Sequence, residues 1–239
     1  MIISSQSELE ESALTLGILP FFRNNIPGFS VEEMTAPGML FGGNEYDGCW
    51  EWKGPVVRSR TTAYGKFFRK KAGFVSRELL PLFLRMRRMR YPVAPDSADE
   101  MIYEIISLND RMTSTELRLT LDNKPRKRTA ADLPEIGMTS RDLSLQEERQ
   151  SFKKSQLEGP LQRLQMGGWL CISDFKYKQT KKGERYGWGV AEYSTPEMLF
   201  DCYPLVSTLS EEECMDAIIT YVGGRFPAAT PDRLKKLLS

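Results

Sequence analysis

The order of predicted elements over residues 97–195 most constrains the fold of this chain, because three helical segments precede two strands around a basic turn. Two capping boxes, Ser97-x-x-Glu100 and Thr113-x-x-Glu116, open the first two helices, and in each box both side chains satisfy free backbone N–H groups. The third helix should carry leucines at i, i+4 and i+7 and end at a glycine pair, which are Leu157, Leu161, Leu164, Gly167 and Gly168.

Two strands should follow the third helix. Trp169–Lys178 alternates enough for a strand, Lys181–Arg185 is predicted to be a hairpin turn, and Tyr186–Ser194 should return as the second strand. Three helices followed by a hairpin are typical of a winged-helix module, which presents its last helix to the DNA major groove. We therefore expect an α+β fold, with a winged helix (helix-turn-helix with a β-hairpin wing) in the C-terminal half and a mixed N-terminal region.

This pattern indicates a partner class, nucleic acid, because the third helix and the hairpin both carry basic or amide side chains. The candidate DNA contacts on the helix are Lys153, Lys154, Gln156, Gln162 and Arg163, and those on the hairpin are Lys181, Lys182 and Arg185. The alternative is that the module contacts a protein and that these charges are simply solvated.

The net charge of +1 conceals a segregation of charge along the chain. Residues 1–52 carry eight acidic residues and one basic residue, whereas residues 53–90 carry twelve basic residues and one acidic residue. Residues 91–239 are close to neutral, with twenty basic and twenty-three acidic residues. A concentrated positive block raises the local potential that attracts a polyanion.

Within this block, basic and aromatic residues are interleaved. Cations neutralise phosphates, and aromatic rings can stack on unpaired bases or wedge into a duplex. Two alternatives stay open: the phenylalanines of the block belong to the core, or the acidic first 52 residues neutralise its bases within the molecule. The candidate contacts here are Arg58, Arg60, Tyr64, Lys66, Arg69, Lys70 and Lys71.

Several kinds of chemistry are excluded or disfavoured by composition. The chain has no histidine, which rules out Ser-His-Asp and Cys-His catalysis and the commonest zinc sites. Its four cysteines, Cys49, Cys171, Cys202 and Cys214, lack paired metal-ligand spacing, so we expect no metal and no cofactor. Trp50-Glu51-Trp52 could raise the pKa of a catalytic glutamate, but alternating tryptophans more often mark a strand.

We expect a cytoplasmic, monomeric protein without a membrane span. No apolar run approaches the roughly 20 residues that a span needs, and the acidic N-terminus has no hydrophobic signal core. The stretch from Tyr91 to Asp96, with prolines at 92 and 95, is the best candidate boundary. This predicts an N-terminal region over 1–94, a winged-helix domain over 95–200, and C-terminal helices over 201–239 that pack on the core.

Several short strings together resemble the AlkZ-related proteins, a small bacterial family related to the winged-helix DNA glycosylases. The strings are Trp50-Glu-Trp-Lys-Gly-Pro55, Ala63-Tyr-Gly-Lys-Phe-Phe68, Lys71-Ala-Gly-Phe-Val-Ser-Arg77, Leu164-Gln-Met166 with Asp174-Phe175, and Tyr186-Gly-Trp188 with Pro196-Glu197. The resemblance covers roughly residues 8–200.

The resemblance implies a winged-helix architecture and a role in recognising or repairing alkylated DNA. A monofunctional glycosylase positions a water against the sugar while it binds the extruded base. The glycosylases carry an early Gln-x-Gln motif, and none occurs here, so no catalytic residue is assigned. Two other functions remain: a transcriptional regulator, which should dimerise on a palindromic site, and a noncatalytic protein-interaction module.

Overall fold

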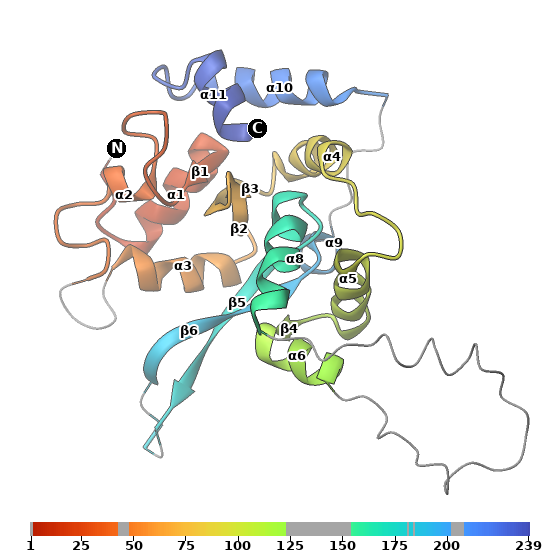
Figure 1. The fold of residues 1–239 in the computed structure, drawn as a ribbon. Coiled ribbons are helices and arrows are strands. Elements are labelled where there is room, and N and C mark those ends of the chain that lie inside the picture. The colour runs from red at the N-terminus through yellow and green to blue at the C-terminus, as the bar shows by residue number, and fades with distance from the viewer. Residues whose placement is uncertain (1, 43–47, 123–153, 181, 184, 202–207) are drawn as a thin grey trace, which may run out of the picture.

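The N-terminal part of the chain forms a unit of three helices and a three-stranded antiparallel sheet. The computed structural model describes residues 2–42, 48–122, 154–180, 182–183, 185–201 and 208–239. The sheet has the strand order β1–β3–β2, so that the first strand pairs with the third (Figure 1). In chain order the elements of this unit are α1 (Gln6–Leu16), β1 (Ile18–Pro20), α2 (Val31–Met34), α3 (Cys49–Arg58), β2 (Thr62–Phe68) and β3 (Lys71–Ser76).

In the residues that the structure describes, a second unit after the connecting helix α4 (Leu80–Arg90) has the same order of helix, strand, helix, helix, strand, strand. Its sheet also pairs the first strand with the third, in the order β4–β6–β5. The protein is therefore a mixed α+β fold in which one topology occurs twice. The elements of the second unit are α5 (Ala98–Asn109), β4 (Met112–Thr113), α6 (Ser114–Asp122), α8 (Lys154–Met166), β5 (Cys171–Gln179) and β6 (Arg185–Ser194).

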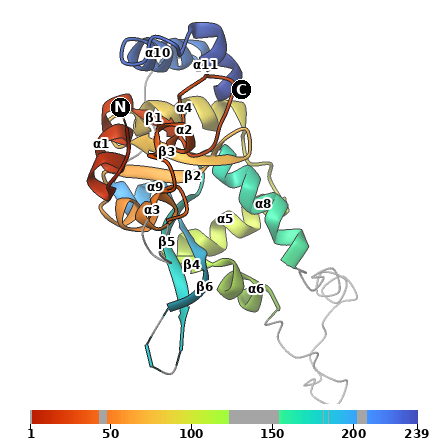
Figure 2. The same ribbon diagram turned by 90° about the vertical axis from the view of Figure 1, so that its left-hand side faces the viewer.

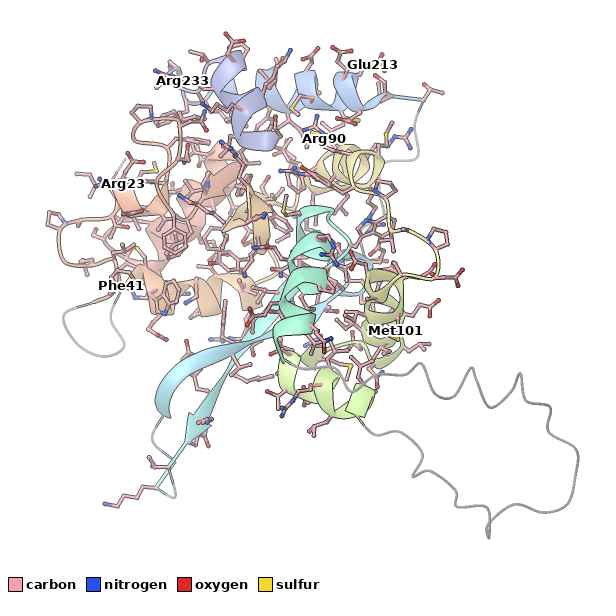
Figure 3. The ribbon with its side chains drawn as sticks, in the orientation of Figure 1. Arg23, Phe41, Arg90, Met101, Glu213 and Arg233 are labelled. Carbon is pink, nitrogen blue, oxygen red and sulfur yellow. The ribbon has the colours of Figure 1, made fainter. Side chains whose placement is uncertain are left out.

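Three further helices complete the described chain: α9 (Pro196–Phe200), α10 (Glu211–Gly223) and α11 (Pro231–Leu238). The last two lie over α4 and the N-terminal unit (Figure 1). Arg90, labelled in Figure 3, connects α4 to both of these helices. Its Nε donates to Glu211 Oε1 on α10 at 2.7 Å, and its Nη1 donates to the main-chain oxygen of Leu238 on α11 at 3.0 Å. No helix of the described ranges is both long and apolar enough to cross a membrane.

The buried apolar residues form two hydrophobic clusters, one centred on each unit. The larger gathers residues from the N-terminal unit, α4, the start of β5 and the C-terminal helices, among them Phe21, Phe67, Phe74, Phe83 and Ile218. The smaller lies inside the second unit and includes the three leucines predicted for the third helix; its residues are Ile102, Ile106, Leu117, Leu157, Leu161 and Leu164, among others.

The capping signals in the sequence are confirmed. The Ser97 hydroxyl accepts from the N–H of Glu100 at the start of α5. At the start of α6, the N–H of Glu116 donates to the Thr113 hydroxyl, and the N–H of Thr113 donates to the Glu116 carboxylate. The predicted end of the third helix also holds, because α8 stops at Met166 and Gly168 has a φ of 69°.

The strand expected at Trp50–Trp52 is wrong, since these residues lie in α3. Pro55 lies inside this helix and cannot donate a main-chain hydrogen bond. Both tryptophans are half-buried, and Trp50 packs edge-on against Phe21, with ring centroids 5.8 Å apart. The carboxylate of Glu51 accepts a hydrogen bond from the Tyr177 hydroxyl at 2.6 Å, across to β5.

Candidate nucleic-acid interface

Several arginines of the basic block between residues 53 and 90 are engaged inside the molecule. The Nη1 of Arg58 lies 2.8 Å from Oδ1 of Asp174 on β5. Arg60, at a positive φ of 61°, donates to the main-chain oxygen of Ser173 at 2.9 Å and to that of Val57 at 3.1 Å. These bonds join the end of α3 to β5, so both predicted DNA contacts have structural roles.

The acids that pair with this block come from the C-terminal half, contrary to the alternative that residues 1–52 neutralise it. In the described part of the chain, arginines 58, 88 and 90 form ion pairs with Asp174, Glu197 and Glu211. The Arg88–Glu197 pair is mostly buried and measures 2.6 Å. Pairing thus compensates one arginine of α3 and two of α4, whereas the hairpin between these helices has no such pair among the described residues.

That β2–β3 hairpin carries four exposed cations, Lys66, Arg69, Lys70 and Lys71, which we call the hairpin cations. None has a carboxylate partner among the residues that the structure describes. Lys71 donates from Nζ to the main-chain oxygen of Arg23 at 2.9 Å. An ammonium has three donors, so this bond leaves Lys71 with capacity for an anion.

The turn between the two strands holds its cations in a costly conformation. Arg69 and Lys70 have φ values of 48° and 69°, and Phe68 pairs with Lys71 around them. Two successive residues with positive φ match a type I′ hairpin turn, for which Asn-Gly is the preferred pair. Side chains with a Cβ cost roughly 1 kcal/mol or more each in this region. Backbone strain of this kind is concentrated at functional sites in proteins.

The structure removes Tyr64 from the candidate contacts. Its side chain is 3% exposed, and its ring lies 4.7 Å from that of Phe74 and 6.0 Å from that of Phe175, measured between centroids. Burial also raises the pKa of the Tyr64 hydroxyl well above its ordinary value. Phe67 and Phe68 are likewise buried, which confirms the alternative that the phenylalanines of this stretch are core residues.

On α8, the predicted DNA contacts Gln162 and Arg163 differ in whether their side chains are already bound within the protein. Arg163 donates from Nη2 and Nε to the two carboxylate oxygens of Asp99 at 2.6 and 2.8 Å, and this hydrogen bonding to Asp99 raises the pKa of its guanidinium. Gln162 is half-buried and lines a cavity of about 290 Å³ together with Lys66, Glu158 and Tyr193. The structure therefore places Lys66 and Gln162, from the two different units, at one opening.

Of the remaining predicted contacts, Gln156 is exposed on α8. Lys153 and Lys181 are outside the described residues, as are the side chains of Lys154 and Arg185. Lys182 is exposed at the end of the β5–β6 hairpin, where its N–H donates to the Thr180 hydroxyl at 3.3 Å.

Two buried polar residues were missed at the sequence level. Gln165 is 1% exposed and accepts a hydrogen bond from the main-chain N–H of Lys66, so it joins α8 to β2. Lys53 is 3% exposed, with Nζ 3.6 Å from the centroid of the Trp50 ring, and burial lowers its pKa to about 8. Both positions lie in strings that carry the family resemblance, but helical periodicity alone does not show which residues of other elements pack against them.

The described residues contain no group of three or more acids or cysteines placed to hold a metal ion. A sequence profile of the AlkZ-related family matches residues 3–239, which is nearly the whole chain. The chain belongs to the AlkZ-related family. No match to it is found among curated proteins.

One similar solved structure is the DNA glycosylase AlkZ of Streptomyces sahachiroi. The identity to this AlkZ-related chain is 14% and the TM-score is 0.46. The alignment covers 95% of this chain and 52% of the glycosylase, so the chain spans about half the length of that enzyme.

Proposed function

We propose that this AlkZ-related protein binds DNA through its β2–β3 hairpin. One observation carries the proposal: the hairpin cations Lys66, Arg69, Lys70 and Lys71 are exposed and have no carboxylate partner in the described chain, whereas the arginines on either side are bound internally. Uncompensated cations on one hairpin neutralise phosphates and release counterions.

The repeated topology supports a winged-helix interpretation of both units. In each, three helices precede a hairpin and the first strand pairs with the third. We propose that residues 97–195 form one such module, as the sequence predicts, and that residues 6–76 form another. In this arrangement the hairpin cations occupy the wing of the N-terminal module, which in this fold contacts the DNA backbone beside the groove.

Helix α8 of the second unit lies next to the β2–β3 hairpin and extends the proposed interface. Figure 2 shows α8 beside β2, and the bond between Lys66 and Gln165 fixes this approach. Gln162 lies at the cavity that Lys66 also lines. Amide side chains can read base edges, while lysines hold phosphates, so the proposed interface runs from the β2–β3 hairpin to α8.

The family membership and the name of the similar glycosylase favour a role in the recognition or repair of damaged DNA. We assign no catalytic residue, because the chain contains no Gln-x-Gln. We also propose that the protein is a cytoplasmic monomer organised as an N-terminal region (1–94), a winged-helix domain (95–200) and C-terminal helices (201–239).

The test is fluorescence anisotropy with two labelled duplexes that differ only in an abasic-site analogue. Binding of both duplexes, tighter for the abasic one, would support damage recognition and justify an assay for base excision. Equal binding would support DNA binding without damage recognition. No binding at low salt would contradict the proposed function and favour a protein partner.

A further inference from the structure

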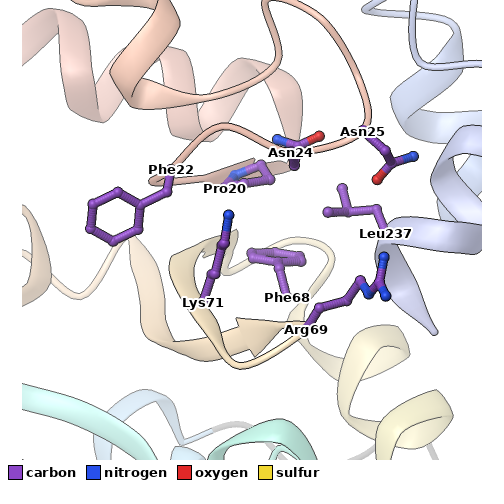
Figure 4. A pocket seen from close by; sticks show the side chains of 8 residues that line it. All are labelled: Pro20, Phe22, Asn24, Asn25, Phe68, Arg69, Lys71 and Leu237. Carbon is purple, nitrogen blue, oxygen red and sulfur yellow. The ribbon is translucent and has the colours of Figure 1, made fainter.

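The hairpin turn forms one wall of a small cavity at the top of the N-terminal unit. The cavity has a volume of about 220 Å³ and lies between the segment after β1, the β2–β3 turn and the C-terminal helix α11 (Figure 4). The amide Nδ2 of Asn25 donates to the main-chain oxygen of Arg233 at 2.8 Å, which holds the first of these walls against the third.

Two of the hairpin cations line this cavity. Lys71 and Arg69 lie on opposite sides of the Phe68 ring in Figure 4. The cavity lining includes no acidic side chain among the described residues. The Arg69 guanidinium forms no hydrogen bond or ion pair with the described chain, and Lys71 is bound to the main-chain oxygen of Arg23 alone. Positive charge is therefore concentrated here without an internal partner.

The rest of the lining limits what can enter. Pro20, Phe68 and Leu237 supply apolar surface, and Asn24 and Asn25 supply amides. Asn24 is held in place, since its Nδ2 donates to the main-chain oxygen of Phe29 at 2.7 Å and its Oδ1 accepts from the N–H of Ile26 at 2.9 Å. The volume is below the roughly 300 Å³ at which pockets for drug-sized ligands begin. A single small anionic group fits these conditions.

We infer that this cavity binds a terminal phosphate of a DNA strand, and this inference rests on the proposed DNA binding. A phosphomonoester carries between about 1.5 and 2 negative charges at pH 7, whereas an internal phosphodiester carries one. Two cations that line one recess match the larger charge. A recess of this size also admits a chain end more readily than a phosphate that continues into sugars on both sides.

The inference places the protein at strand breaks. A phosphate end is the product of a reaction that cleaves the DNA backbone, such as the incision that follows loss of a damaged base. The protein would therefore hold the product of strand incision, with the remaining hairpin cations, Lys66 and Lys70, on the adjoining backbone.

The experiment compares nicked duplexes of one sequence that carry either a phosphate or a hydroxyl at the nick, with 5′ and 3′ ends tested separately. Anisotropy at constant salt should give at least about tenfold tighter binding for one phosphate end, the ratio that corresponds to 1.4 kcal/mol. Lys71→Gln and, separately, Arg69→Gln should bring this ratio close to one.

Lys70→Gln is the matched control, because Lys70 belongs to the same turn but does not line the cavity. It should weaken binding to both ends equally and leave the ratio unchanged. Equal affinity of the wild-type protein for phosphate and hydroxyl ends would overturn the inference while the proposed function stands, and so would a ratio that survives both lining variants. Absence of binding to every duplex would instead overturn the proposed function, and the inference with it.

Discussion

The main-chain N–H of Lys66 donates a hydrogen bond to the side-chain oxygen of Gln165, with 3.1 Å between N and Oε1. The Nε2 of the same glutamine donates to the main-chain oxygen of Leu161 at 2.8 Å, so its amide is used at both ends. The bond between Lys66 and Gln165 joins β2, an edge strand of the N-terminal sheet, to α8 of the second unit, 99 residues further along the chain. It fixes where the hairpin cations lie relative to α8.

Replacing Gln165 by leucine should therefore destabilise the protein. The substitution leaves the N–H of Lys66 without its partner, and an unsatisfied buried donor costs about 1–3 kcal/mol. Chemical denaturation should show a loss in the free energy of unfolding within this range. Gln162→Leu is the control, since Gln162 is half-buried on the same helix and forms no described hydrogen bond. An unchanged unfolding midpoint for Gln165→Leu would contradict the bridging role.

Changing Arg69 to asparagine together with Lys70 to glycine should separate folding from binding. Both new residues accept the positive φ values of 48° and 69°, so the free energy of unfolding should be unchanged or rise by about 1 kcal/mol. Duplex affinity should nevertheless fall, because two phosphate contacts are lost. Denaturation and anisotropy on the same sample check both effects. Full affinity in a stable variant would exclude the turn from the interface.

Arg58→Gln should leave DNA affinity within about twofold of the wild type, although Arg58 belongs to the basic block. Its guanidinium is bound to Asp174, whose pKa is lowered even though burial acts in the opposite direction, because Arg58 donates to its carboxylate. The pair is partly exposed, so its loss should cost at most about 1 kcal/mol of stability. A large loss of affinity, comparable with that of Lys70→Gln, would show that the internal pairing does not decide which cations bind DNA.

Lys53 should make stability depend on pH. Its pKa is lowered from 10.5 to about 8 in the folded protein, so between these values the unfolded chain binds more protons than the folded one. The free energy of unfolding should therefore rise with pH above 8, relative to Lys53→Met, and level off near 10.5. Denaturation from pH 7 to 9.5 measures the difference, and parallel curves for the two proteins would contradict the lowered pKa.

The elements found from the sequence are those whose signals are local. Capping boxes at Ser97 and Thr113 and the leucine spacing in α8 each depend on a few neighbouring residues, and the structure confirms them. The predicted strands near Trp169–Lys178 and Tyr186–Ser194 correspond to β5 and β6. In these segments the spacing of apolar residues within one element is enough to predict whether that element is a helix or a strand.

The sheet of the N-terminal unit was not predicted because its strands do not alternate. Six of the seven residues of β2 are buried, so the strand lacks the period of two that marks a half-exposed strand. The turn carries Arg69 and Lys70 where a hairpin usually has Asn-Gly, which hides the hairpin as well. The pairing of Arg58 with Asp174 spans 116 residues, and no local pattern reports it.

The central claim is that the hairpin cations bind the DNA backbone, and its most direct test is the salt dependence of duplex binding. Each phosphate contact contributes about 0.9 to the slope of log affinity against log salt concentration. Replacing Lys66 and Lys71 by glutamine, together with Arg69→Asn and Lys70→Gly, should lower the magnitude of this slope by about 3 to 4. A folded variant with the wild-type slope would contradict the account.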